Sequence, residues 1–221
     1  MQKRSLTIFV MLAVLIFYRV RLASAEPFQA WFNDLIAEDP NFTTEELHTI
    51  QKGKVVARAR DDVNCPGKGE IIFLRSYGTV NLKPEECWKR MQNLAAMYQT
   101  QPLMVKVSQI PAPGPAVYLQ HTLGLLGREY YYVNRYDFLP QSYIITYIID
   151  KSRPYNVVDG FGFWRIYPWG DNRSLVENGT YMDIGFKING VVYKPPSWLM
   201  KQLSLIDSPN TIKQLRRYLC P

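Results

Sequence analysis

The chain has 221 residues, with 26 Lys and Arg against 19 Asp and Glu, and a formal net charge of +7. Residues 1–25 hold four of those basic residues and no acid, so residues 26–221 carry 22 basic and 19 acidic residues, a net charge of +3. A charge this small, without a basic run, argues against nucleic acid as a partner. The length suits one domain with a sizeable core.

Residues 1–25 have the pattern of a signal peptide. Two basic residues precede the uncharged apolar run Leu6–Tyr18, and the small residues Ala23-Ser24-Ala25 form a cleavage site before Glu26. The apolar run is shorter than the ~20 residues that a membrane-spanning helix needs. We therefore expect this segment to be cleaved and the mature chain, residues 26–221, to be periplasmic or secreted. Without cleavage, the segment would anchor the protein to a membrane.

Residues 26–51 predict a helical lead-in to a domain over residues 52–221. Thr43-Thr44-Glu45-Glu46 has the pattern of a helix N-cap followed by acidic residues in the first turn. The next segments predict a strand at Lys54–Arg60, a loop at Asp61–Gly69 and a strand at Glu70–Val80. A helix then begins at Pro84, because proline is tolerated in the first helical turn.

The middle of the chain predicts one strand after another, separated by turn residues. These strands are Met104–Ile110, Val117–Leu125, Arg128–Phe138, Tyr143–Asp150 and two more within Val157–Ile184. Gly160 and Gly162 fall on the same face as Trp164, and glycine inside a strand indicates a bend or a close approach. We expect them to leave room for a helix or a ligand.

The C-terminal segment predicts one helix with a kink. Apolar residues recur at helical spacing over Trp198–Ile206 and again in a second segment that ends at Leu219. Asp207-Ser208-Pro209 begins this second segment, and the proline there predicts the kink. The apolar stripe of such a helix would face the sheet, so we expect one kinked helix laid across the strands.

The motifs resemble those of the START-like superfamily, also called SRPBCC or helix-grip, which includes polyketide cyclases, lipid-transfer proteins and ubiquinone-binding proteins. Leu82-Lys83-Pro84-Glu85-Glu86-Cys87-Trp88 resembles the opening of its first core helix. Gly162–Pro168, with Trp164, resembles its penultimate hairpin. The resemblance implies an α+β fold: a curved antiparallel sheet of about six or seven strands gripping a long, kinked C-terminal helix, with short helices after the first core strand.

Such a fold places a cavity between the sheet and the C-terminal helix, and strand alternation predicts its lining. On Arg128–Phe138, charged residues at alternate positions mark the outer face. On the last strand, Glu177 would face outward. The predicted cavity residues are His121, Tyr130, Tyr132, Tyr136, Tyr147, Trp164, Asn178, Thr180, Met182 and Trp198.

No catalytic or metal-binding constellation is present in the sequence, and no cofactor is expected. His121 has the chemistry of a general base, but a core histidine bonded to a tyrosine is the favoured interpretation. Of the three cysteines, Cys65 and Cys220 are the favoured pair if one disulfide forms, because Cys87 lies on an apolar helical stripe.

Three functions fit these patterns. The favoured one is an exported domain that binds or carries a hydrophobic small molecule (a lipid, an isoprenoid or a polyketide), with transient membrane contact. The alternatives are a cyclase- or hydrolase-like enzyme using the same cavity, and a non-catalytic envelope interaction protein whose core is filled by its own side chains.

Overall fold

The computed structural model describes residues 27–125, 127–188 and 191–221, so the predicted signal peptide lies outside the described residues. The chain divides into two compact units: Met1–Asn41 with Asp62–Ile71, and Phe42–Asp61 with Ile72–Pro221.

The first unit contains a helix over residues 27–37 whose aromatic side chains meet at helical spacing. The ring centroid of Phe28 lies 5.7 Å from that of Trp31 and 5.8 Å from that of Phe32. In the same unit, the Lys68 ammonium lies 5.7 Å from the Phe28 ring centroid, within the range of a cation–π contact. This helix lies within the segment 26–51, for which the sequence predicts a helical lead-in.

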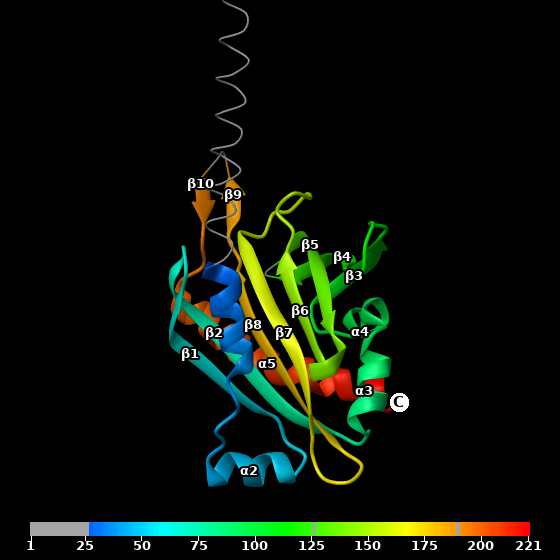
Figure 1. Cartoon of the computed structure of the whole chain (residues 1–221). Helices are drawn as coiled ribbons and strands as arrows, with labels where there is room; N and C mark the ends of the chain where they lie inside the picture. The colour runs from blue at the N-terminus through cyan, green and yellow to red at the C-terminus, as the bar shows by residue number, and fades with distance from the viewer. Residues whose placement is uncertain (1–26, 126, 189–190) are drawn as a thin grey trace, which may run out of the picture. The chain divides into compact units, whose positions relative to one another are not determined.

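The sheet has eight antiparallel strands in the order β1-β2-β8-β7-β6-β5-β4-β3, one more than the upper end of the prediction (Figure 1). Its strands are β1 Val56–Cys65, β2 Gly69–Val80, β3 Met104–Ile110, β4 Val117–Leu125, β5 Arg128–Leu139, β6 Ile144–Ile149, β7 Asp159–Pro168 and β8 Ser174–Asp183. A separate two-stranded sheet, β9 Phe186–Ile188 with β10 Val191–Tyr193, was not predicted.

The predicted loop at Asp61–Gly69 is wrong over most of its length, because β1 continues to Cys65. The turn is confined to residues 66–68 between β1 and β2. Gly67 within it and Gly69, the first residue of β2, both adopt a φ of +76°. Asp61 and Asp62 are exposed on β1, the edge strand of the sheet, where charged side chains are tolerated. A polar sequence alone therefore does not distinguish an exposed edge strand from a loop.

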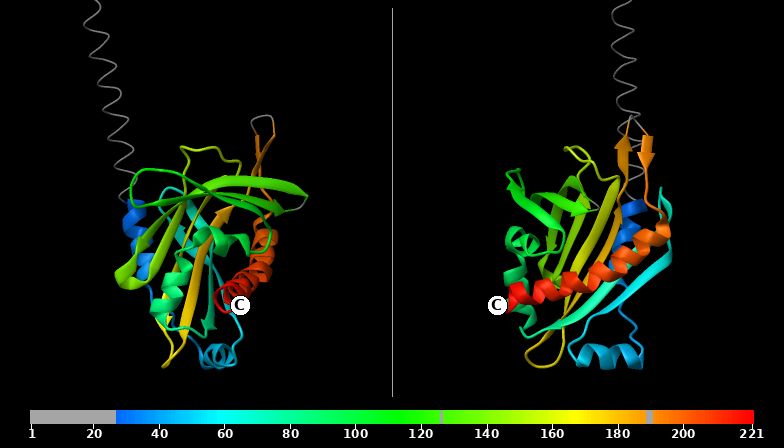
Figure 2. Two further views of the ribbon diagram at one scale, coloured as in Figure 1. Left: turned by 90° about the vertical axis from the view of Figure 1, so that its right-hand side faces the viewer. Right: turned by 180° about the vertical axis from the view of Figure 1, so that it is seen from behind.

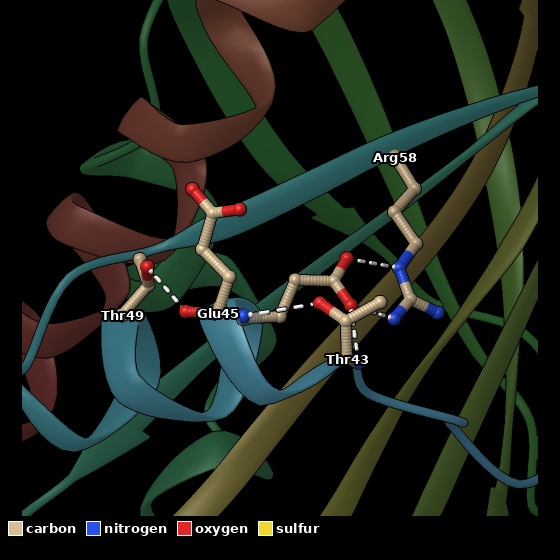
Figure 3. Close-up of polar contacts among 5 residues, drawn as sticks. Thr43, Glu45, Thr49 and Arg58 are labelled. Atoms are coloured by element: carbon tan, nitrogen blue, oxygen red, sulfur yellow. Dashed lines mark hydrogen bonds and ion pairs between the residues drawn. The ribbon is translucent and has the colours of Figure 1, made fainter.

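The helix α2 (Thr44–Gln51) begins with the predicted cap. The Thr43 side chain accepts a hydrogen bond from the Glu46 backbone N–H at 3.2 Å, and the Glu46 carboxylate accepts one from the Thr43 N–H at 2.8 Å. Arg58 of β1 donates to the same carboxylate through Nε at 2.7 Å (Figure 3). The cap therefore also fastens α2 to the first strand.

The predicted helix after Pro84 is two helices, α3 (Pro84–Met91) and α4 (Leu94–Gln99). Asn93 lies between them and its side-chain oxygen accepts from the Ala96 backbone N–H at 3.4 Å, so it caps α4. A short 3-10 helix, η1 (Pro140–Ser142), separates β5 from β6.

The helix α5 (Ser197–Leu219) is continuous and bent, with Pro209 inside it, and it lies across one face of the sheet (Figure 2). Pro209 lacks the N–H of a helical hydrogen bond, which accounts for a bend rather than a break. The face under α5 carries the main core. That core contains Val80, Cys87, Trp88, Met91, Leu94, Met97, Leu119, Tyr136, Ile145, Tyr147, Trp164, Ile166, Val176, Ile212, Leu215 and Leu219.

α5 packs tightly against β2 at Gly78. A Cβ added to Gly78 would lie 2.6 Å from Ile212 Cγ2. Beside it, Arg216 donates to the carbonyls of Thr79 and Gly53, each at 2.7 Å, and Ser208 forms a hydrogen bond with Ser76. These contacts fix α5 on the sheet face that is called the inner face below.

Candidate functional site

The inner face of β5 carries a row of buried side chains, as strand alternation predicts. Tyr130, Tyr132, Asn134 and Tyr136 are each at most 4% exposed, whereas the intervening Arg135 is exposed. The neighbouring strand β4 places His121 opposite Tyr132. Cross-strand partners lie on the same face of a sheet, so β4 and β5 together build one aromatic wall.

His121 is fully buried within this wall. Its ring stacks on Tyr132 at 5.1 Å between centroids and meets Tyr98 of α4 edge-on at 4.9 Å. Burial lowers the pKa of His121 from 6.5 to about 3, so the imidazole is neutral at pH 7. Its polar partner is a phenol: the distance between His121 Nε2 and the Tyr136 oxygen is 2.8 Å.

A connected set of polar groups surrounds the Tyr136 hydroxyl. The Asn134 amide nitrogen donates to it at 3.1 Å. The ring of Tyr98 lies beside that of Tyr136, at 5.5 Å between centroids, and the Tyr98 hydroxyl accepts from the indole N–H of Trp164 at 2.9 Å. Burial raises the pKa of both Tyr98 and Tyr136, so both remain protonated phenols. This cluster of five residues is called the polar chain below.

Two atoms at the ends of the polar chain have no hydrogen-bond partner among the described residues. They are Nδ1 of His121 and Oδ1 of Asn134, and both are buried. Buried polar atoms are hydrogen-bonded in the great majority of cases, so two such atoms in one cluster point to a missing partner. Asn134 and Tyr98, which belong to this cluster, were not among the predicted cavity residues.

The remaining inner-face predictions lie on β6, β7 and β8. Tyr147 is buried, and its hydroxyl donates to the Gly179 carbonyl at 3.4 Å. Asn178 is buried with its amide donating to the Phe163 carbonyl at 3.2 Å, and Thr180 is half-buried. These side chains share the face with the polar chain, but Tyr147 and Asn178 donate to strand carbonyls rather than to that chain.

A second apolar cluster lies beside the polar chain. It contains Tyr130, Tyr132, Ile149, Val157 and Ile184, with the partly buried Leu123, Leu125, Met182 and Met200 packed against it. Met200 belongs to the first turns of α5, so this cluster is the one that the start of the helix covers. Its border is only partly buried.

Trp198 does not join the predicted site. Its side chain is 66% exposed, whereas Met200, two residues later, packs on the second apolar cluster. Residues two apart on a helix point about 200° away from each other, so the face that buries Met200 turns Trp198 to the outside.

The predicted task of Gly160 and Gly162 is also corrected. A Cβ at Gly162 would lie 2.2 Å from the Gly179 carbonyl and 2.5 Å from the Tyr147 hydroxyl, and one at Gly160 would lie 3.0 Å from Ile149. The space beside Trp164 is therefore used by neighbouring strands, and α5 makes its close approach at Gly78 instead.

Glu177 was expected to face outward, which implied exposure, but it is completely buried. Its carboxylate lies 2.8 Å from Nε of Arg75 and accepts a hydrogen bond from the Tyr167 hydroxyl at 2.7 Å. The alternation of residues along a strand predicts which face a side chain is on, but not whether other residues cover that face. Here the face is covered, so Glu177 forms a buried ion pair with Arg75.

The three cysteines are free thiols, so the predicted bond between Cys65 and Cys220 is not formed in the structure. Burial raises the pKa of Cys87 to about 12, which makes this thiol unreactive at neutral pH. The described His, Cys, Asp and Glu side chains form no group of three that could hold a metal ion. No described helix combines the length and apolar character needed to cross a bilayer.

A sheet that holds a long C-terminal helix across its inner face defines the helix-grip fold of START-like proteins. Solved structures with this fold match the chain. A STAR-related lipid transfer protein fragment from Xanthomonas axonopodis is 15% identical (TM-score 0.58, 84% of this chain and 97% of that one). Human StAR-related lipid transfer protein 5 is 10% identical (TM-score 0.56, 90% and 97%).

The fold is shared with an enzyme too. The Zhui aromatase/cyclase from Streptomyces sp. R1128 is 14% identical (TM-score 0.53, 66% of this chain and 90% of that one). No protein-family model and no curated protein matches the sequence. At these identities the likeness establishes the fold alone.

Proposed function

We propose that this chain is an exported domain that binds and carries a hydrophobic small molecule, such as a lipid, an isoprenoid or a polyketide, between the inner face of the sheet and α5. The observation that carries the proposal is the second apolar cluster. It is lined by buried aromatic and aliphatic side chains, and its border at Leu123, Met182 and Met200 is only partly covered.

The energetics of such a site are favourable. Burial of apolar surface contributes about 25 cal/mol per Å², so ~200 Å² of ligand surface gives roughly 5 kcal/mol before the entropic costs of binding. A predominantly apolar wall with a few convergent polar groups is the usual composition of small-molecule sites. The second apolar cluster and the adjacent polar chain have this composition.

The low pKa of His121 and its hydrogen-bond partner favour a carrier over an enzyme. A general base works best with a pKa near the operating pH, whereas burial lowers the pKa of His121 to about 3. Its hydrogen-bond partner is the phenol of Tyr136 rather than a carboxylate that would stabilise an imidazolium. The lipid-transfer names of two structural neighbours support the same choice.

The proposal is tested on purified native protein. Extraction with organic solvent followed by mass spectrometry should release a hydrophobic compound, and the extracted protein should bind the neutral dye Nile red. It should also speed the transfer of a fluorescent lipid between vesicles. Protein that releases no compound, binds no dye and transfers no lipid would contradict the proposal, and ligand conversion without transfer would favour an enzyme.

Membrane contact is part of the proposal, and the exposed Trp198 supports it because tryptophan favours the membrane–water interface. Trp198→Ser should slow lipid transfer between vesicles while leaving Nile red affinity unchanged. An equal loss of both would instead assign Trp198 to the binding site.

A further inference from the structure

The C-terminal end of α5 is fastened to α3 next to two of the three cysteines. The Arg90 guanidinium of α3 donates a hydrogen bond to the carbonyl of Leu219, the residue before Cys220. In the opposite direction, the Tyr218 hydroxyl donates to the carbonyl of Arg90 at 3.1 Å. Because these two hydrogen bonds join the same helical ends, they hold the backbone at residue 220 beside α3.

Cys87 lies one helical turn before Arg90, on the same side of α3. Its side chain is fully buried in the main core, where Leu215 and Leu219 of α5 are fully buried too. Its sulfur lies 3.9 Å from the sulfur of Met91, another fully buried member of this core. The Cys87 thiol therefore faces the core that α3 and α5 share, at the end of α5.

Cys220 can turn toward this thiol. It directly follows α5, and its N–H donates to the Arg216 carbonyl at 2.8 Å, so the helix holds its backbone. Its side chain is exposed and can change rotamer without displacing a packed neighbour. The two thiols already influence each other, since Cys220 adds to the effect of burial in raising the pKa of Cys87. Such an electrostatic influence weakens with distance, so it places the two groups near each other.

We propose that Cys87 and Cys220 form a disulfide in the exported protein, in place of the predicted pairing of Cys65 with Cys220. The inference rests on export in the proposed function, because disulfides persist in oxidising compartments. Cys65 remains a thiol: it is 1% exposed at the end of β1, and its sulfur contacts the carbonyl of the adjacent Pro66 at 3.9 Å. The structure describes the reduced protein.

The bond forms by two successive exchanges with a disulfide oxidant, RSSR. The exposed Cys220 first attacks the oxidant as a thiolate, which releases one RSH and leaves Cys220 joined to R. Cys87 then loses its proton, attacks the Cys220 sulfur and expels the second RSH. Two cysteine thiols are oxidised and one disulfide is reduced to two thiols, which carry away the two cysteine protons.

Burial controls the rate of the second exchange. It raises the pKa of Cys87 to about 12, so the Cys87 thiolate is rare at neutral pH and reagents in solution do not modify it. The Cys220 sulfur is held beside it, and a reaction between two held groups has an effective concentration far above that of a reagent. Protein that carries glutathione on Cys220 should therefore accumulate first. Its conversion to the internal disulfide should accelerate about tenfold for each pH unit between 7 and 9.

The disulfide would close a loop that contains β3 to β8, which restricts the unfolded chain. It would add a covalent link at the end of α5 that covers the main core. The start of α5, with Met200 on the second apolar cluster, would receive no new constraint. The stabilisation would therefore act away from the proposed ligand site.

Peptide mapping of full-length mature protein, isolated from the periplasm or the medium with its thiols alkylated at once, tests the inference. Digestion without reductant should give one peptide pair that joins Cys87 to Cys220. Unalkylated protein should have an intact mass about 2 Da below that of the reduced chain, since two hydrogens are lost. A Cys65–Cys220 pair, a dimer linked through Cys220, or three free thiols in the exported protein would overturn the inference.

Reduction under native conditions gives a second readout. A mild reductant should lower the urea midpoint of the wild type, because the loop is no longer closed. Cys220→Ser, at an exposed position, should have the lower midpoint with and without reductant. Cys65→Ser is the matched control and should keep the wild-type response to reductant. An equal response in Cys220→Ser would assign the effect to other groups and overturn the inference.

These outcomes are separate from those of the carrier function. Exported protein that transfers lipid while its three cysteines stay free would overturn the disulfide alone. Exported protein that contains the Cys87–Cys220 bond but binds no Nile red and transfers no lipid would overturn the carrier function alone.

Discussion

At the residue scale, Gly162 is the position where the sheet is least tolerant of a side chain. The nearest atom to an added Cβ would be the Gly179 carbonyl oxygen at 2.2 Å, and backbone cannot rotate away as a side chain can. We expect Gly162→Ala to lower the free energy of unfolding by about 1–3 kcal/mol through overpacking. The urea midpoint at constant m-value measures this.

The matched control is Gly160→Ala on the same strand and face. Its added Cβ would meet the flexible end of Ile149 at 3.0 Å, so the clash can be relieved by a side-chain movement. The loss of stability should be smaller than for Gly162→Ala. Equal losses would mean that the sheet near β6 is equally rigid at both positions.

His121 makes stability depend on pH. The pKa in the folded protein is lowered to about 3, against 6.5 for an unhindered histidine. Between these two pKa values the unfolded chain binds a proton at His121 and the folded chain does not. The free energy of unfolding therefore falls as the pH falls from about 6.5 toward 3. The slope is at most about 1.4 kcal/mol per pH unit.

His121→Phe should flatten that part of the stability curve, as measured by urea unfolding at a series of pH values. His48→Gln, at the other histidine of the chain, is the comparison variant for the loss of a histidine. Parallel curves for the wild type and His121→Phe would show that His121 is not buried as a neutral group.

At the element scale, the start of α2 predicts a separate loss of stability in acid. Contact with Arg58 lowers the pKa of Glu46 to about 2, with the Thr43 hydrogen bonds acting in the same direction. A carboxyl with a depressed folded pKa stabilises fully above its unfolded value of about 4.5 and loses that contribution as the pH falls toward 2.

Glu46→Gln should therefore lower stability at pH 7 by about 1 kcal/mol and weaken the pH dependence between about 5 and 2. Glu45→Gln removes the same charge from the same helical turn without touching the Arg58 contact, so it is the matched comparison variant. A Glu46→Gln curve parallel to that of the wild type would contradict the role of this cap.

The elements that the sequence predicts best are those with a local cause. The Thr43 cap, the alternation on β5 and the proline-bent α5 each depend on residues near one another in the chain. The β1–β2 hairpin was misjudged because its polar residues lie on an edge, and Glu177 because only tertiary packing buries it. The polar chain joins α4, β4, β5 and β7, and its unpartnered atoms depend on rotamers that no sequence pattern specifies.

At the scale of the whole molecule, export is a separate prediction. The protein recovered from the medium or the periplasm should have the mass of residues 26–221, as measured by intact mass spectrometry. Replacing Ala23 and Ala25 by Arg should abolish that cleavage because the site requires small residues. A mature protein that retains residues 1–25 would instead indicate a membrane anchor.

The strand order has a consequence for how the chain reaches this fold. Strands β3 to β8 each pair with a neighbour in sequence, whereas β2 pairs with β8 from Leu74↔Thr180 to Val80↔Ser174, about 100 positions apart. Pairing between strands so far apart in sequence is slow. Until β2 pairs with β8, the edge of β8 remains exposed to other chains. During synthesis, β1 and β2 therefore cannot pair with the rest of the sheet until β8, close to the end of the chain, has been made.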